Sequence, residues 1–143
     1  MIDPTLVTRK MSLILQALPR LSKLADLPRD SYMNDPTHET LAERYLERTI
    51  GRMIDINFHL ATEFEHGVPK DYYDSFVVLG SLGVMPHEMA KECAKAAGLR
   101  NPIVHEYDEI DAARVYEALA VAVRQIPQYL EAIQRFLDRN RPA

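Results

Sequence analysis

Apolar residues recur three and four positions apart along nearly the whole chain, and this spacing constrains the fold more than any other feature. Residues at these intervals share one face of an α-helix, so the pattern predicts amphipathic helices. No stretch alternates apolar and polar residues over the length of a strand. The expected fold class is therefore all-α, an antiparallel bundle of four to five helices joined by short loops.

Start and stop signals divide the pattern into predicted helices. Asp3–Pro4 and Asp35–Pro36 each place a capping carboxylate before a first-turn proline. The first helix is expected to bury Leu6 and the second Leu41. The predicted helices run from residue 4 to a break at 27–30, from 36 to about 65, from 72 to 82, from 86 to about 97, and from about 111 to 137. Gly98 is expected to cap the fourth.

Size and composition indicate one globular domain over residues 1–143. The chain is 47% hydrophobic and 27% charged, which is enough apolar material for a core. Its polar N-terminus and the absence of an apolar run of roughly 18–20 residues predict neither a secretory signal nor a membrane span. The single cysteine, Cys93, excludes a disulfide framework. We expect a soluble, cytoplasmic protein that does not associate with membranes.

Charge is unevenly distributed. The net charge of −4 argues against binding nucleic acid through bulk electrostatic attraction. Residues 1–30 carry five basic and three acidic side chains, whereas residues 31–66 carry three and seven. A local basic cleft for RNA, or an acidic face for a protein partner, is compatible with this distribution.

One segment is not explained by helix packing. Residues 98–107 bring together Arg100, Asn101, His105 and Tyr107 at a predicted break between helices. Asn101–Pro102 reads as a helix cap followed by the first helical residue, because a residue before proline avoids the α region. The following turn would hold His105 close to that cap, with Arg100 just outside it.

An arginine and a histidine are sufficient for metal-free RNA cleavage. Arginine offers a permanent bidentate charge for a phosphate, and histidine can transfer protons near neutral pH. RNA supplies the nucleophile, its own 2′-OH. One histidine cannot easily serve as both base and acid, but a symmetric dimer would bring two together. In the structural alternative, Arg100 pairs with a carboxylate, Asn101 caps a helix and His105 lies in the core.

The string Arg100-Asn-Pro-Ile-Val-His-Glu-Tyr107 resembles the R-N-x3-H-x-Y signature of the HepT-like toxins, a branch of the HEPN superfamily of helical-bundle ribonucleases. The stretches Arg52–His59, Tyr72–Gly83 and Gly98–Arg100 are also similar to that family, so the resemblance extends over about the whole chain. Pro102 departs from the pattern, since many relatives carry an aliphatic residue there.

This resemblance implies a metal-independent endoribonuclease, the toxin of a type II toxin–antitoxin system. Arg100 and His105 would be the catalytic pair, supported by Asn101. Tyr107 would be the residue that a cognate MNT-type nucleotidyltransferase, the antitoxin, modifies with AMP. Family members are typically homodimers whose motifs line one cleft. The alternative is a non-enzymatic helical subunit that binds substrate for a two-component nucleotidyltransferase. A purely structural dimerisation bundle is a third interpretation.

Other charged residues have two interpretations each. Asp55 could line the cleft or orient Arg100, or it could form a local pair on its own helix. The arginines at positions 44, 48 and 52 form one stripe, which could follow an RNA backbone or be a solvated face shared with glutamates. Glu63-x-x-His66 matches half of a di-iron motif, but no second copy exists. We therefore expect no metal and no other cofactor.

Overall fold

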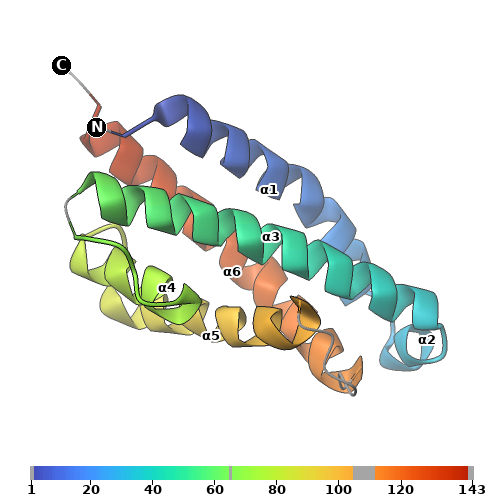
Figure 1. Cartoon of the computed structure of the whole chain (residues 1–143). Helices are drawn as coiled ribbons and strands as arrows, with labels where there is room; N and C mark the ends of the chain where they lie inside the picture. The colour runs from blue at the N-terminus through green and yellow to red at the C-terminus, as the bar shows by residue number, and fades with distance from the viewer. Residues whose placement is uncertain (1, 65, 105–111, 142–143) are drawn as a thin grey trace.

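The computed structural model describes residues 2–64, 66–104 and 112–141, with the backbone alone for residues 96, 97 and 99–104. Within these ranges the chain forms only helices and loops, which confirms the all-α fold class (Figure 1). The elements are α1 (Pro4–Ala25), α2 (Arg29–Met33), α3 (Pro36–Glu63), α4 (Tyr72–Ser81), α5 (His87–Val104) and α6 (Ala112–Arg139).

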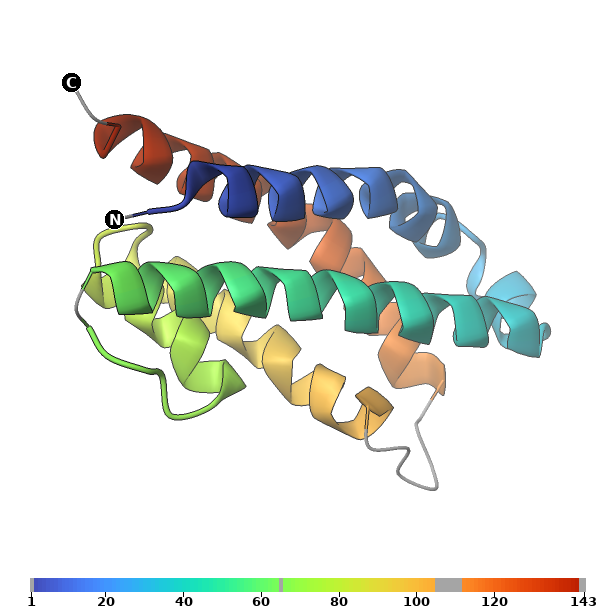
Figure 2. The same cartoon turned by 45° about the horizontal axis from the view of Figure 1, so that its top comes forward.

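The long helices α1, α3 and α6 build the bundle, and α4 and α5 complete it. Helix α1 packs against both α3 and α6, and α4 and α5 pack together against α3. Figures 1 and 2 show α1 and α3 side by side with opposite chain directions. None of the described helices is long and apolar enough to cross a membrane.

The predicted starts of the two long helices are confirmed. The Asp3 carboxylate accepts hydrogen bonds from the N–H groups of Thr5 and Leu6, at 3.0 and 3.1 Å. The Asp35 carboxylate accepts one from Thr37 at 3.0 Å. In each case the first helical residue is a proline. Its missing N–H costs no hydrogen bond, because N–H groups in the first turn have no acceptor within the helix.

Helix α2 falls where the sequence predicts only a break. It is five residues long and is held by Tyr32, whose ring is buried 4.9 Å from the ring of Tyr116 in α6. The Tyr116 hydroxyl also donates to the Leu27 carbonyl at 2.6 Å. Contacts with a residue far away in the chain therefore shape this short helix, and the break itself contains no signal for them.

The buried faces of α1 and α3 differ by one residue from the prediction. Leu6 and Leu41 are 37% and 40% exposed, whereas their neighbours Val7 and Ala42 are fully buried. Successive residues are about 100° apart around a helix, and an apolar stripe can be wide enough to include two neighbours. The spacing therefore fits either residue of each neighbouring pair. The packing of the other helices selects the buried one.

A buried polar network joins three helices inside the core. The Tyr129 hydroxyl of α6 donates to the Asn57 side-chain oxygen of α3 at 2.7 Å. The Asn57 amide nitrogen donates to the hydroxyl of Ser75 in α4 at 3.3 Å. All three residues are fully buried. Burial raises the pKa of Tyr129 well above its usual value, because a phenolate would lack solvation there.

Candidate active site

Helix α5 continues into the segment that carries Arg100 and Asn101. The prediction that Gly98 ends this helix and that Asn101–Pro102 starts another is wrong, since α5 reaches Val104. A glycine cap needs a positive φ, and Gly98 does not have one. Proline in a helix interior removes one N–H, here the donor to the Gly98 carbonyl. Helix α5 accommodates that loss and does not end at the glycine.

The structure places only part of the predicted site. The backbone of Arg100 and Asn101 lies near the C-terminal end of α5. His105 and Tyr107 lie outside the described residues. The catalytic roles of Arg100, Asn101 and His105, and the modification of Tyr107, therefore stay predictions.

A cavity of about 400 Å³ lies between α3, α5 and α6, close to this end of α5. Gly98, two residues before Arg100, lines it, and so do Leu46 and Ile50 from the buried face of α3. Both views show the last turns of α5 beside the first half of α6 (Figures 1 and 2). Its remaining described lining residues are Glu92, Lys95, Arg114, Glu117, Ala118, Val121, Ala122, Arg124 and Gln125.

Two arginines, Arg114 and Arg124, line this cavity together with Glu117 and the pair of Lys95 and Glu92. Neither Arg114 nor Arg124 has a carboxylate within salt-bridge distance among the described residues, whereas Lys95 pairs with Glu92 at 3.0 Å. Guanidinium groups without a described carboxylate partner, beside an apolar wall, suit a ligand that combines phosphate with a flat base. Neither arginine was predicted from the sequence as a site residue.

The signal that could have revealed them is the spacing along α6. Arg114, Ala118, Val121 and Gln125 lie four, three and four residues apart and thus share one helix face. An arginine at the start of a stripe of small apolar residues on one helix face is a candidate for lining a cavity. The spacing does not show which element that face meets.

Asp55 contacts α1, and it is not among the described lining residues of the cavity. Its carboxylate lies 2.9 Å from the Lys10 ammonium nitrogen, with the two side chains 56% and 33% exposed. This pair joins two helices, so it differs from the local pair that the spacing on α3 suggested. The contact fits a structural role between α1 and α3.

His59 has a structural contact at the N-terminus of α1. Its Nε2 atom accepts a hydrogen bond from the Asp3 backbone N–H at 2.9 Å. In the described part of the chain, no group of three or more histidine, cysteine, aspartate or glutamate side chains is arranged to hold a metal ion.

Comparison with known proteins identifies the family. The model of the family described as Ribonuclease HepT-like matches residues 14–133, which include the 98–107 segment. The chain is 32% identical over 136 residues to the "tRNA nuclease HepT" of Aphanizomenon flos-aquae, covering 95% of this chain and 92% of that protein. It is 29% identical over 93 residues to the "mRNA nuclease HepT" of Shewanella oneidensis, covering 65% of each.

A solved structure has the same fold. The AMPylated HEPN toxin of Shewanella oneidensis, solved in complex with its MNT antitoxin, superposes with a TM-score of 0.82 at 23% identity. The match covers 94% of this chain and 99% of the toxin. Because the family model spans most of the chain and a relative matches nearly all of it, the chain belongs to the ribonuclease HepT-like family.

Proposed function

We propose that this HepT-like ribonuclease is the toxin of a type II toxin–antitoxin pair and cleaves RNA internally without a metal ion. The observation that carries the proposal is the family match, which contains Arg100, Asn101, His105 and Tyr107 in one short segment. Arg114 and Arg124 line the cavity beside the end of α5, and neither has a salt-bridge partner among the described residues, which supports a site for an anionic substrate. The enzyme would act in the cytoplasm.

In the proposed reaction, His105 takes the proton of a ribose 2′-OH, and the oxygen attacks the adjacent phosphorus. The bond from phosphorus to the 5′-oxygen breaks, and that oxygen receives a proton. The products are a 2′,3′-cyclic phosphate and a 5′-hydroxyl end. Arg100 stabilises the added negative charge on the phosphate. Proton transfer by His105 would contribute roughly 10²–10⁴-fold to the rate.

A homodimer would supply the second histidine. One imidazole cannot hold a proton for the leaving group while it removes another from the nucleophile. Two copies of the chain related by a two-fold axis would present both segments to one RNA. Asn101 would hold the Arg100 and His105 side chains in position relative to each other.

The proposed partner is an MNT-type nucleotidyltransferase that silences the toxin. It would transfer AMP from ATP to the phenolic oxygen of Tyr107 and release pyrophosphate. The modified side chain would carry a bulky anion beside Arg100 and His105, where it would compete with the RNA phosphate. The AMPylated relative in complex with its MNT antitoxin supports this proposal.

Cleavage by purified variants tests the enzymatic proposal. His105→Ala and Arg100→Ala should each lower cleavage of tRNA and mRNA at least 100-fold, with chelator present throughout. The matched control is His66→Ala, because His66 is an exposed histidine in the loop after α3. Circular dichroism should show an unchanged fold. Wild-type rates in the His105→Ala protein would refute the mechanism.

The alternative is a binding subunit of a two-component nucleotidyltransferase without ribonuclease activity. Co-expression with an MNT-type nucleotidyltransferase, followed by intact-mass measurement, tests the modification in both cases. AMP-sized mass increases that disappear in Tyr107→Phe would support Tyr107 as the acceptor. AMPylation together with undetectable cleavage by the unmodified wild type would favour the binding subunit.

A further inference from the structure

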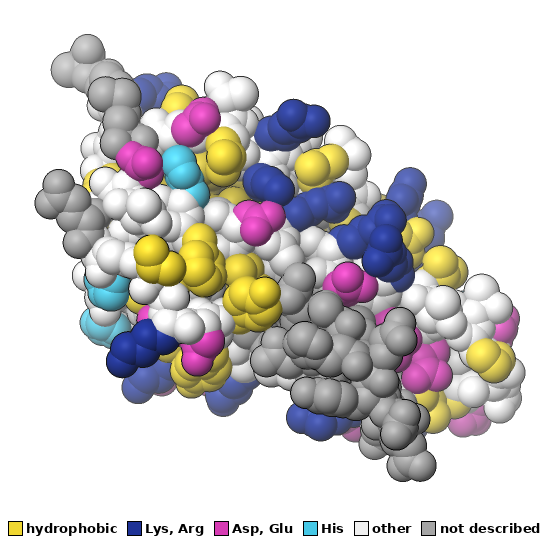
Figure 3. Space-filling view, in the orientation of Figure 1, with side chains coloured by type: hydrophobic (Ala, Val, Ile, Leu, Met, Phe, Trp, Pro, Cys, Tyr) yellow, Lys and Arg dark blue, Asp and Glu magenta, His cyan; other side chains and the backbone are white. Residues whose placement is uncertain are grey.

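A narrow basic groove runs between α1 and α3, on the side of α3 that faces away from the cavity. Three arginines and one tyrosine dominate it, and its volume is about 120 Å³. We call it the α1–α3 groove; its lining residues are Leu13, Gln16, Ala17, Arg20, Tyr45, Arg48 and Arg52. Figure 3 shows Lys and Arg side chains gathered over α1 and α3 on this face.

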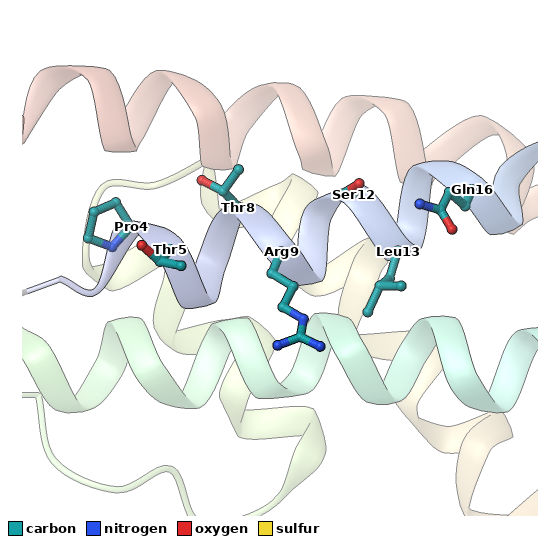
Figure 4. A pocket seen from close by; sticks show the side chains of 7 residues that line it. All are labelled: Pro4, Thr5, Thr8, Arg9, Ser12, Leu13 and Gln16. Carbon is teal, nitrogen blue, oxygen red and sulfur yellow. The ribbon is translucent and has the colours of Figure 1, made fainter.

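A second hollow extends this basic surface along α1. It shares Leu13 and Gln16 with the α1–α3 groove and adds Arg9 (Figure 4). Figure 4 shows the Arg9 and Leu13 side chains extending from α1 toward α3. The basic surface therefore continues past the groove, toward the N-terminal end of α1.

Two described acidic residues of α3 near the groove are paired with basic side chains that do not line it. Glu47 lies 3.4 Å from Arg44, and Asp55 lies 2.9 Å from Lys10. Across the described ranges, neither Arg48 nor Arg52 has a salt-bridge partner. The arginine stripe on α3 is therefore not uniform, because its first member is paired and the next two are available to a ligand.

Arg20 is also available, and Tyr45 orients it. Its guanidinium carbon lies 5.7 Å from the centre of the Tyr45 ring, a cation–π contact that leaves the N–H groups free to donate. No carboxylate pairs with Arg20 in the described part of the chain. The groove thus combines three guanidinium groups that no described carboxylate compensates, in a chain whose net charge is −4.

We propose that the α1–α3 groove binds the phosphate backbone of the RNA substrate, outside the cleavage segment. Arg48 and Arg52 are one helical turn apart, about 6 Å along the axis, comparable to the spacing of successive phosphates in a nucleic-acid strand. Contacts to phosphate oxygens carry no sequence information, so the contribution of the groove to RNA binding is independent of the RNA sequence. The inference rests on the proposed ribonuclease function for the identity of its ligand.

The groove and the cavity use different faces of α3. Leu46 and Ile50 line the cavity, whereas Tyr45, Arg48 and Arg52 line the groove. A helix with its side chains is roughly 10–12 Å across, a distance that a few nucleotides span. One RNA could therefore contact both sites, with the groove adding affinity and leaving the chemical step unchanged.

The test compares two double variants that remove the same charge. Arg48→Gln/Arg52→Gln removes the two groove arginines of α3, which have no salt-bridge partner among the described residues. Arg135→Gln/Arg141→Gln is the control, because both of these arginines are exposed on or just after α6 and paired, with Glu131 and Asp138 respectively. The probe is a fluorescently labelled single-stranded RNA, and its dissociation constant is measured over a series of salt concentrations.

Two lost phosphate contacts should lower the slope of log affinity against log salt by about 1.4 and weaken binding roughly 10-fold at physiological salt. KM for RNA cleavage should rise by a similar factor while kcat stays unchanged. The control variant should match the wild type within about two-fold. Unchanged thermal unfolding in both variants establishes that the fold is intact.

Three results would overturn the proposal: unchanged RNA affinity in the groove variant, an equal loss in the control variant, or loss of the nucleotidyltransferase complex with RNA binding retained. The last would identify the groove as a protein interface. Failure of the proposed function is a separate outcome, recognised by absent cleavage in the wild type. The binding measurement still tests the groove in that case.

Discussion

Replacing Tyr129 with phenylalanine should destabilise the protein although it removes only one oxygen atom. The Tyr129 hydroxyl donates to the Asn57 side-chain oxygen at 2.7 Å and lies 3.1 Å from the Met53 carbonyl oxygen. Both Tyr129 and Asn57 are fully buried. In the variant, the Asn57 oxygen would lose its donor in a place that water does not reach.

The expected cost follows from that buried oxygen. An unsatisfied polar group in a core costs roughly 1–3 kcal/mol, and we take about 2 kcal/mol. Unfolding entropy of about 2.1 cal/mol/K per residue gives roughly 0.3 kcal/mol/K for a chain of this length. The melting temperature should therefore fall by about 7 °C.

Tyr32→Phe is the matched control. Tyr32 is 1% exposed, and its hydroxyl has no hydrogen-bond partner in the described part of the protein. Removing this hydroxyl should leave stability unchanged or raise it by up to about 1 kcal/mol, because an unpaired polar group is taken out of the core. The ring contact with Tyr116 is retained.

Chemical denaturation followed by circular dichroism measures both free energies of unfolding. Adding Asn57→Leu to Tyr129→Phe completes a double-mutant cycle, with an expected coupling energy of about 0.5–3 kcal/mol. A loss below about 0.5 kcal/mol in Tyr129→Phe, or equal losses in the two tyrosine variants, would refute the role assigned to this hydrogen bond.

Two further predictions concern pH and helix packing. Burial raises the pKa of Tyr32 to about 12 and that of Tyr129 well above its usual value, and it raises the pKa of Cys93 to about 11. In the unfolded state the Cys93 thiol loses its proton from about pH 9 and the tyrosines from about pH 10, so the native state holds more protons above about pH 9. The free energy of unfolding should therefore fall as pH rises through this range. The Tyr32→Phe/Tyr129→Phe variant should show a shallower fall between pH 9 and 11 by denaturant titration, and an identical slope would contradict this cause. Gly80→Ala should destabilise by about 1–3 kcal/mol in thermal melts, because a Cβ there would lie 2.7 Å from the His87 ring nitrogen; wild-type stability would show that His87 moves without cost.

The helix starts were predictable because their causes are local. Asp3 and Asp35 bond to N–H groups two or three residues ahead, so the cap and the first helical residues are adjacent in the sequence. The family could also be inferred, because the R-N-x3-H-x-Y signature is contained in eight consecutive residues. The functional prediction for Arg100 and His105 depends on that short string.

The end of α5 was predicted incorrectly from equally local signals. Gly98 and Pro102 are both residues that commonly end helices, yet α5 includes them. Such propensities amount to about 1 kcal/mol for glycine and about 3 kcal/mol for proline in a helix interior. Packing of a helix against its neighbours can exceed costs of this size, and a sequence pattern does not contain that packing.

By itself, the sequence determined the helical class, the starts of α1 and α3, and the family resemblance, since each follows from residues within a few positions of one another. Only the tertiary structure decided that Val7 and Ala42, not Leu6 and Leu41, face the core. It also decided that Asp55 pairs with Lys10, whereas no described carboxylate forms a salt bridge with Arg48 or Arg52 of the same helix. These outcomes depend on which helices pack against each other. The contacting residues are far apart in the chain, so a local sequence pattern does not contain these contacts.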